Sequence, residues 1–466
     1  MRVGKRMINH GMDDTIAAIA TPIGESGIGI VRLSGKDALK IADQAFVSPS
    51  GKRPSACKTY TTHYGSIVQQ GKILDEVILT VMRSPRSYTR EDIVEINCHG
   101  GIICLRQALE LVLENGARLA EPGEFTRRAF LNGRIDLTQA EAVLDIIRAR
   151  TDTALKIGME QLKGGLSSRL NKYRGILLDV LSGLEAGIDF PEEGFSEPDK
   201  KKDLRKLSEV GQGLKDLVRN SRLARILREG VHVVICGKPN TGKSSLLNAL
   251  LKEERSIVTP VAGTTRDTIE EVIDIQGIPV RIVDTAGILE PRDLVEKKAV
   301  QRAQAQIAGA DLVLILFDGS KRLAQEDLFL CRKVERKKAI AVINKIDLKQ
   351  KVERDKLEKS FKHIVAISAK KTKNIGLLEK AIAGLVYGGQ VPGSEPLLVA
   401  NLRYIKAIQK AEKVIAEARE SLDNRLPPEF IAQGIKEALG YLDEVLGKKF
   451  SEDLLDKIFA EFCIGK

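Results

Sequence analysis

The chain has 466 residues, of which 43% are hydrophobic and 29% are charged. This composition is typical of a globular protein with two or three domains, and it excludes a fibrous or largely disordered chain. The formal net charge of +11 favours polyanionic partners, but charge alone leaves nucleic-acid binding an open question.

The cysteines and the N-terminus indicate the compartment. Six scattered cysteines form no C-x-x-C pair, so neither a zinc knuckle nor a redox dithiol is indicated. The basic N-terminus has no apolar segment typical of a signal peptide, and no apolar run approaches the roughly 18–20 residues of a membrane span. We therefore expect a soluble, cytoplasmic protein without membrane contact.

The N-terminal part, residues 13 to about 125, has the pattern of a mixed α and β domain. β-rich runs are predicted at Thr15–Thr21, Ile28–Leu33, Glu76–Met82 and Ile93–Asn97, with a helix between Ile102 and Glu114. From about residue 126 the apolar spacing becomes helical and stays so to Arg228.

Short apolar runs then alternate with helical stretches, which indicates a parallel sheet covered by helices on both faces. The runs are Val231–Cys236, Val280–Val283, Leu312–Phe317, Ile340–Ile343 and Ile364–Ile367.

A Gly- and Pro-rich link, Gly388–Pro396, ends this α/β unit, and a second helical region follows it. Its last helix is predicted to be capped by Ser451 and to carry Leu454, Leu455, Ile458 and Phe462. The economical architecture is one helical domain interrupted by an inserted α/β domain; two independent helical modules are the alternative.

The segment Gly237-Lys-Pro-Asn-Thr-Gly-Lys-Ser244 matches the phosphate-binding P-loop motif. It follows a predicted strand and opens the helix predicted at Ser245–Leu251. Its backbone N–H groups would curl around the phosphates of a nucleotide. Lys243 would reach the β- and γ-phosphates, and the Ser244 hydroxyl would bind Mg²⁺.

Four further segments stand in the order typical of a GTPase. Asp284-Thr-Ala-Gly287 would lie near the magnesium and the γ-phosphate, and Thr264 or Thr265 would give Mg²⁺ a second hydroxyl. Asp347, in Asn344-Lys-Ile-Asp347, would accept both donors of guanine, which adenine does not present. Ser368-Ala-Lys370 would read the guanine O6 through a backbone N–H. The predicted GTP contacts are Asn240, Thr241, Gly242, Lys243, Ser244, Ser245, Thr259, Thr264, Thr265, Asp284, Thr285, Ala286, Gly287, Asn344, Lys345, Asp347, Ser368, Ala369 and Lys370.

Ras-like enzymes position the attacking water with a glutamine after the D-T-A-G segment. Here Ile288 and Leu289 stand in that place, and an apolar side chain cannot orient water. Either an arginine finger from a partner or the nearby Glu296 would have to take over this task.

Taken together, the chain resembles the MnmE (TrmE) family of tRNA-modification GTPases over roughly residues 13 to 466. Besides the GTPase motifs, the resemblance rests on further segments along the chain. They include Ile28-Gly-Ile-Val-Arg-Leu-Ser-Gly35, His99-Gly-Gly101, Glu121-Pro-Gly-Glu-Phe-Thr126, Ala129-Phe-Leu-Asn132, Ile188-Asp-Phe-Pro191 and the terminal Phe462-Cys-Ile-Gly-Lys466.

The resemblance implies a multidomain fold. Residues 1–126 would form an α+β folate-binding and dimerisation domain, and residues 127–229 and 388–466 an all-α helical domain made of two chain segments. Residues 230–387 would form the inserted α/β P-loop GTPase domain with its Ras-like parallel sheet.

It also implies an activity. Family members work with the FAD-dependent partner MnmG, in a heterotetramer, on C5 of the wobble uridine of certain tRNAs. They install an aminomethyl or carboxymethylaminomethyl group, whose carbon comes from a tetrahydrofolate (the 5-formyl or methylene derivative). Hydrolysis of GTP is stimulated by K⁺ and occurs as two GTPase domains meet across a homodimer.

Carried onto this sequence, the K⁺-binding role falls on Asn240, helped by Thr259, Val261 and Thr264. Mg²⁺ would be held by Ser244 and Thr265, and the water-orienting catalytic role falls on Glu296. The folate site would comprise Arg32, Glu95, Arg134 and Lys466. A carboxylate suits the amide donors of a pterin, and cations suit its anionic glutamyl tail.

Four other residues admit two interpretations. Cys463 is a candidate reactive thiol near the folate, or only a small buried residue of the terminal helix. His99 orients a substrate or supports a glycine turn. Arg127 and Arg128 touch tRNA or cap a surface helix, and we favour the surface helix.

Two other functions compete with tRNA modification. A ribosome-assembly switch of the Era or Der kind shares the P-loop, but the sequence shows one GTPase domain and no C-terminal KH pattern. A one-carbon transferase regulated by the GTPase domain is the third hypothesis.

Overall fold

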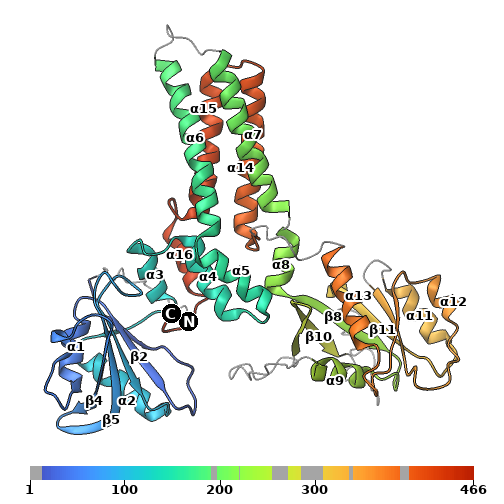
Figure 1. Cartoon of the computed structure of the whole chain (residues 1–466), viewed down its shortest axis with the longest axis horizontal. Coiled ribbons are helices and arrows are strands. Elements are labelled where there is room, and N and C mark those ends of the chain that lie inside the picture. The colour runs from blue at the N-terminus through green and yellow to red at the C-terminus, as the bar shows by residue number, and fades with distance from the viewer. Residues whose placement is uncertain are drawn as a thin grey trace, which may run out of the picture. The chain divides into compact units, whose positions relative to one another are not determined.

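The computed structural model describes residues 13–189, 197–219, 221–253, 271–284, 308–334, 339–388 and 398–466. They belong to two compact units, Met1–Leu144 with Asp443–Lys466, and Asp145–Leu442 (Figure 1). In this described part, no helix combines the length and the apolar character needed to cross a membrane. The unit boundaries fall inside two helices, so the four-segment division into domains stays a prediction.

The first unit is built on a seven-stranded sheet in the order β3-β4-β5-β6-β2-β1-β7. Neighbouring strands are antiparallel except β1 and β7, which are parallel. The strands are β1 (Ile16–Ile19), β2 (Gly29–Ser34), β3 (Phe46–Val47), β4 (Thr61–Gln69), β5 (Lys72–Met82), β6 (Ile93–Cys98) and β7 (Arg118–Leu119).

Two helices, α1 (Ala38–Ala45) and α2 (Ile102–Glu114), cover one face of this sheet and bury alternate strand residues such as Val31, Leu33 and Leu79. A short 3₁₀ helix, η1 (Pro54–Ala56), contacts α1. The other face leaves Tyr64, Ile73 and Ile78 exposed.

The four predicted β-rich runs are confirmed as strands, and α2 matches its predicted bounds. Strand β4 was missed because it contains no apolar run. Most of its residues are polar and partly exposed, and few are buried. Helix α1 was missed as well; it is short and is followed directly by strand β3.

Helices α3 (Glu124–Leu131), α4 (Leu137–Arg148) and α16 (Glu452–Phe459) complete the first unit, although the end of α4, from Asp145 onward, belongs to the second. The Ser451 hydroxyl accepts a hydrogen bond from the Leu454 N–H (3.3 Å), as the predicted cap requires. The prediction that Phe462 lies on this helix is wrong: the helix ends at Phe459, and Phe462 is buried beyond it with its ring centroid 5.5 Å from that of Phe459.

The second unit contains a bundle of four long helices that lie side by side in Figure 1. They are α6 (Gly165–Asp189), α7 (Glu197–Arg219), α14 (Leu402–Asp423) and α15 (Pro428–Leu446), with the shorter α5 (Asp152–Leu162) and α8 (Ser221–Glu229). Lys172 of α6 pairs with Glu209 of α7, and Lys436 of α15 pairs with Glu185 of α6. Helices from before and after the α/β segment thus form one helical domain, as predicted.

The inserted α/β domain has a six-stranded sheet in the order β13-β12-β11-β8-β10-β9. The strands are β8 (Val231–Gly237), β9 (Glu271–Ile275), β10 (Ile278–Asp284), β11 (Leu312–Asp318), β12 (Ala339–Asn344) and β13 (Ile364–Ala366). The helices are α9 (Lys243–Glu253), α11 (Gln325–Lys333), α12 (Arg354–Glu358) and α13 (Ile375–Tyr387).

Successive residues of β8 enter two different apolar cores, one on each face of the sheet, so the predicted two-sided covering by helices is confirmed. Five strands are parallel, as predicted. The edge strand β9 is antiparallel to β10 and was missed, because Glu271–Ile275 alternates charged and apolar residues. Helix α9 begins two residues earlier than predicted, at Lys243.

Candidate functional site

The P-loop connects the end of β8 to the start of α9 and closes around Lys243. The side chain of Lys243 is buried, and its ammonium donates hydrogen bonds to the carbonyls of Gly237 (3.1 Å) and Lys238 (2.9 Å). The Thr241 hydroxyl also donates to the Lys238 carbonyl (2.8 Å). The loop therefore holds a positive charge inside its curve, where an anion can approach it.

Gly242 shows why this position of the loop requires glycine. Its φ of +99° is a conformation that residues with a Cβ rarely adopt. A Cβ built there would also collide with the side-chain amide of Asn344. The loop is therefore in direct contact with the predicted guanine-recognition segment.

Asn344 joins three segments of the predicted nucleotide site. Its Nδ2 donates to the Thr241 carbonyl (2.8 Å), and its Oδ1 accepts from the N–H groups of Lys345 (2.8 Å) and Ala369 (2.9 Å). The side chain is only 2% exposed. Such a buried amide fixes the relative positions of all three segments, since losing any partner leaves a buried polar group unsatisfied.

Asp318 is a residue that the sequence reading missed. Lys345 donates from Nζ to Asp318 Oδ2 (2.7 Å) and to the Asn240 carbonyl (2.7 Å). Burial raises the pKa of Asp318, but hydrogen bonds from Lys345 and Ser320 outweigh it and lower that pKa. Asp318 follows directly after the apolar run Leu312–Phe317, and an acidic residue at the end of a central strand was the available signal.

The predicted guanine-reading residues lie together. Ser368 donates from Oγ to Asp347 Oδ1 (2.6 Å), and this hydrogen bond lowers the pKa of the Asp347 carboxyl. The Asp347 carboxylate is thus ionised and fixed in orientation. Ser368 and Ala369 are buried, whereas Lys370 is exposed.

Ser244 and Ser245 are exposed in the first turn of α9, and Asp284 ends β10 beside Ile235 of β8. The structure therefore places these residues at the same end of the sheet as the P-loop. The other predicted residues lie outside the described part: Thr259, Val261, Thr264, Thr265, Thr285, Ala286, Gly287 and Glu296.

A second cluster of charged side chains lies in the first unit. Arg32 of β2 and Glu95 of β6 stand opposite each other in the sheet, and Arg32 Nε donates to Glu95 Oε1 (2.7 Å). Arg32 also donates to the Gly465 carbonyl (3.2 Å) and lies over the Phe125 ring at 5.7 Å. The C-terminal tail, 433 residues away in sequence, thus joins the predicted folate residues.

Lys466 and Arg134 extend this cluster. Burial, together with the positive charge of Arg32, lowers the pKa of Lys466. The Arg134 guanidinium lies over the ring of Tyr88 (4.7 Å), whose hydroxyl is 2.9 Å from Thr126 Oγ1. Tyr88 was missed, because an isolated tyrosine in a loop carries no periodic signal.

All four predicted folate residues therefore lie in one unit. Arg32, Glu95 and Lys466 are linked by direct contact or charge, and Arg134 lies against Tyr88, whose pKa both Arg134 and Arg32 act to lower. A carboxylate close to cations fits a ligand with both amide donors and an anionic tail.

Cys463 is exposed and lies beyond the end of α16, so the prediction that places it within the terminal helix is wrong. The backbone N–H of Lys466 donates to the Cys463 carbonyl (3.3 Å), which places this cysteine beside the cluster. This proximity fits the first interpretation of Cys463, and reactivity stays a prediction.

The prediction of a surface role for Arg128 is wrong. Its side chain is buried and donates to Asp14 Oδ1 (2.5 Å), Glu91 Oε1 (3.2 Å) and Glu124 Oε1 (3.0 Å). Arg127 is partly exposed and pairs with Asp456 (3.1 Å). The sequence could not distinguish a solvated helix face from a buried ionic network, because both contain charged residues on a helix.

His99 is an exposed residue held by Asp75. Its Nδ1 is 2.7 Å from Asp75 Oδ1, and its N–H donates to Asp75 Oδ2 (2.9 Å). This hydrogen bond raises the pKa of His99. The next residue, Gly100, has no room for a Cβ against Ser26, which fits the interpretation that His99 supports a glycine turn.

Comparisons with known proteins agree along the whole chain. A family model described as the MnmE helical domain matches residues 137–463, and one described as GTP-binding protein TrmE N-terminus matches residues 15–134. The tRNA modification GTPase MnmE of Geobacillus kaustophilus is 44% identical over 458 residues, which are 97% of this chain and 99% of that protein. The protein of the same name from Clostridioides difficile is 46% identical over 457 residues, 98% of this chain and 100% of its own length.

A solved structure of an Aquifex aeolicus Era variant bound to GDP and aluminium fluoride is 33% identical to part of the chain. The match covers 40% of this chain and 66% of that one, with a TM-score of 0.28.

Proposed function

Since the chain belongs to the MnmE (TrmE) family, we propose that it is a K⁺-stimulated GTPase that modifies wobble uridine in tRNA. It is a GTP hydrolase acting in tRNA modification, in keeping with the names of its relatives. The modification would add an aminomethyl or carboxymethylaminomethyl group to C5 of the uridine, with a tetrahydrofolate as carbon donor and MnmG as FAD-dependent partner.

Binding of GTP would begin at the P-loop. The Lys243 ammonium, which here donates to the Gly237 and Lys238 carbonyls, would turn to the β- and γ-phosphates. The Asp347 carboxylate, held by Ser368, would accept the N1–H and 2-amino donors of guanine. Asn344 and Lys345 would keep these two ends of the nucleotide site at a fixed separation.

The residues near the phosphates fit a pair of cations. Ser244 and Thr265 offer hydroxyl oxygens for Mg²⁺, which neutralises phosphate charge when bound. Asn240, with Thr259, Val261 and Thr264, offers carbonyl and amide oxygens for K⁺. Glu296 would orient the attacking water, which the apolar Ile288 and Leu289 cannot do. Most of these residues lie outside the described part, so the assignments remain proposals.

The cluster of Arg32, Glu95, Arg134 and Lys466 would hold the tetrahydrofolate. The carboxylate of Glu95 would accept the pterin donors, and the cations would hold the glutamyl tail. Lys466 has a lowered pKa and lies beside Arg32, so an anion would relieve the repulsion between the two cations. Tyr88 would keep the Arg134 side chain in place through its ring.

A homodimer and a cytoplasmic location complete the proposal. The exposed apolar side chains Tyr64 and Ile78, which are cross-strand neighbours on β4 and β5, support a role of this sheet face in self-association. The domains would follow the predicted division at residues 126, 229 and 387. The assembly with MnmG would be a heterotetramer, and it would receive the anticodon region of the tRNA.

The observation that carries the proposal beyond GTP hydrolysis is the contact of the C-terminal tail with Arg32, which is itself hydrogen-bonded to Glu95. A simple GTPase switch has no need of this second cluster. The test is a deletion strain, whose tRNA nucleosides are measured by mass spectrometry. The wobble modification should disappear and return with the wild-type gene, but not with Glu95→Ala or with Lys243→Ala.

Lys413→Ala, which removes an exposed lysine of α14, is the matched control and should restore the modification fully. Unchanged modified nucleosides in the deletion strain would contradict the proposal. If ribosomal subunits accumulated there instead, the ribosome-assembly hypothesis would replace it.

A further inference from the structure

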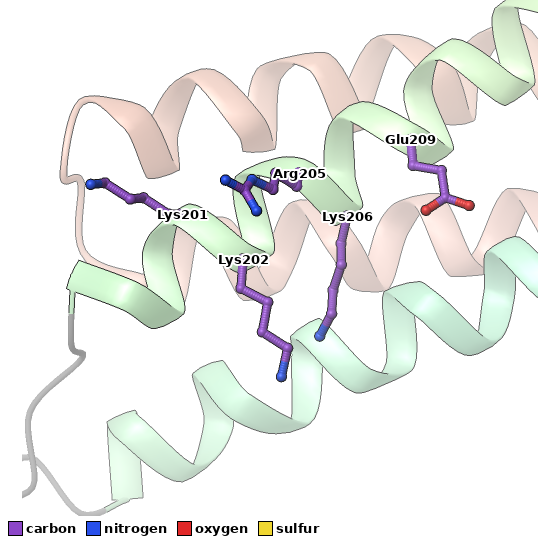
Figure 2. A pocket seen from close by; sticks show the side chains of 5 residues that line it. All are labelled: Lys201, Lys202, Arg205, Lys206 and Glu209. Carbon is purple, nitrogen blue, oxygen red and sulfur yellow. The ribbon is translucent and has the colours of Figure 1, made fainter.

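The first turns of α7 carry a cluster of basic side chains. Figure 2 shows Lys201, Lys202, Arg205 and Lys206 around a hollow of about 430 Å³, with Glu209 further along the helix. Their spacing of one and four residues gathers them on one side of the helix, where Lys202 and Lys206 extend toward α6 in the figure. We name these four side chains the basic face of α7.

Only part of the charge on this face is compensated, by Asp179 and Asp203, which interact with both Lys206 and Lys202. Lys206 already forms an ion pair with Asp179, and its Nζ lies 3.4 Å from Asp203 Oδ1. Glu209 forms an ion pair with Lys172 (2.7 Å). Lys201, Lys202 and Arg205 are exposed, and no carboxylate in the part of the chain that the structure describes forms an ion pair with them.

This arrangement does not serve the stability of the bundle. Like charges four residues apart on a helix, as at Lys201 and Arg205, destabilise it. The buried side of α7 is already formed by residues such as Leu207 and Val210, so the exposed cations add nothing to the core. A ligand that brings negative charge would remove the repulsion.

The chemistry of the hollow selects the kind of ligand. Arginine and lysine are the side chains that bind phosphate oxygens, and they supply most contacts to a nucleic-acid backbone. No aromatic or apolar side chain lines the hollow, so neither base stacking nor an apolar protein anchor has a place there. Lysine is moreover depleted at protein–protein interfaces. The face therefore fits a phosphodiester backbone.

We propose that the basic face of α7 binds the phosphate backbone of tRNA, outside the anticodon bases that undergo modification. The identity of the RNA rests on the proposed function; the affinity for an RNA backbone rests on the hollow itself. The residues involved are distinct from those of the nucleotide and folate clusters.

The test is the affinity of the full-length chain for fluorescently labelled tRNA, measured by anisotropy over a series of KCl concentrations. The triple variant Lys201→Ala/Lys202→Ala/Arg205→Ala should bind at least about tenfold more weakly near 0.1 M salt. The slope of log affinity against log salt should fall by about 2, since about three phosphate contacts are lost. Its GTP hydrolysis without RNA should equal that of the wild type.

Lys215→Ala/Lys406→Ala/Lys413→Ala is the matched control, because it removes three exposed lysines from α7 and α14 of the same bundle. It should keep the wild-type affinity within about twofold. The charge-preserving variant Lys201→Arg/Lys202→Arg/Arg205→Lys should bind tRNA as the wild type does. If the shapes of these side chains, rather than their charges, determined binding, this variant would lose affinity.

Equal affinity and salt slope in the wild type and the triple alanine variant would overturn the inference and leave the proposed function intact. If that variant also failed to support tRNA modification in cells, the face would belong to a protein partner. An equal loss of tRNA affinity in the control would mean that net charge alone explains the effect, and this would also overturn the inference. A wild-type chain without affinity for any tRNA would contradict both the inference and the RNA partner in the proposed function.

Discussion

Gly242 is a P-loop residue that packs against Asn344 of the guanine-recognition segment. Replacing it with alanine places a Cβ in a left-handed conformation and against the Asn344 amide. We expect Gly242→Ala to cost about 1–3 kcal/mol in unfolding free energy, since strained backbone costs that much, and to weaken GTP affinity at least about tenfold. Chemical denaturation and nucleotide titration would measure the two effects.

Gly376→Ala is the control for this substitution. Gly376 lies in α13 with open space around it, so alanine there should change stability by less than about 1 kcal/mol and leave GTP affinity unchanged. Equal GTP affinity in Gly242→Ala and the wild type would contradict the assigned role of the loop.

Asp347 determines the base that is accepted. Its carboxylate, ionised and held by Ser368, would accept two hydrogen bonds from guanine. An asparagine offers one acceptor and adds a donor, which suits the carbonyl that xanthine carries in place of the 2-amino group. We predict that Asp347→Asn loses GTP affinity by about 100-fold or more and gains affinity for XTP, since a mismatched buried polar group is costly. Competition binding with the two nucleotides checks this, and retained preference for GTP would refute the assignment.

Arg128 is a buried cation shared by Asp14, Glu91 and Glu124. Removing it in Arg128→Met takes a buried cation from three carboxylates, of which Asp14 and Glu124 keep only Arg118 as an ion-pair partner, so the unfolding free energy should fall by about 3–5 kcal/mol at neutral pH. Arg127→Met, which removes a partly exposed pair with Asp456, should cost at most about 1 kcal/mol.

The pH dependence of this network follows from the pKa of Glu124. Burial acts to raise it, but hydrogen bonds from Arg118 and from the Glu121 N–H, together with the positive charges of Arg128 and Arg118, outweigh burial, so the pKa in the folded state lies below its ordinary value of 4.5. The stabilisation is thus present above pH 4.5 and is lost as the pH falls through the lower, folded-state pKa. The stability difference between wild type and Arg128→Met should therefore narrow from pH 6 to pH 3, and a constant difference in thermal unfolding would contradict this account.

At the scale of single residues, the sequence predicted the motif positions because loop chemistry restricts them to particular residue types. Asn344, Lys345 and Asp347 lie where they were expected. Asp318 and Tyr88 were missed because their importance comes from a contact with a distant residue rather than from a local pattern.

Helix α7 packs tightly against α6 at Gly213, where a Cβ would collide with the Tyr173 side chain. Tyr173 is buried and cannot move aside without leaving a void. Gly213→Ala should therefore destabilise the bundle by about 1–3 kcal/mol, as overpacking does, although alanine is the better helix former. Gly183→Ala, on an open part of α6, should instead stabilise it by up to about 1 kcal/mol. Denaturation of the two variants measures the contrast, and effects of the same sign would refute this packing.

At the scale of elements, strongly periodic segments were predicted and weakly patterned ones were not. Helix α2 and the central strands β8 and β11 have long apolar patterns, so their positions were predictable. Strands β4 and β9 lie with one side toward solvent and carry alternating polar residues, so tertiary packing decides their conformation.

At the scale of the whole molecule, the interrupted helical domain was predictable from helical stretches on either side of an α/β segment. The pairing of α7 with α14 required knowledge of contacts between residues about two hundred positions apart, which no local pattern contains. The same holds for the contact of the Gly465 carbonyl with Arg32, which the sequence alone did not indicate and only the family resemblance suggested.

The rate of GTP hydrolysis in KCl and in NaCl at equal ionic strength is the most direct test of the proposed catalytic mechanism. It should be measured for the wild type and for Glu296→Ala, with Glu437→Ala as a control that removes an acidic side chain of α15. The proposal predicts a high rate only in KCl, lost in Glu296→Ala and kept in the control. A rate independent of the cation and unchanged by Glu296→Ala would contradict it, because the catalytic charge and the water-orienting group would then come from elsewhere.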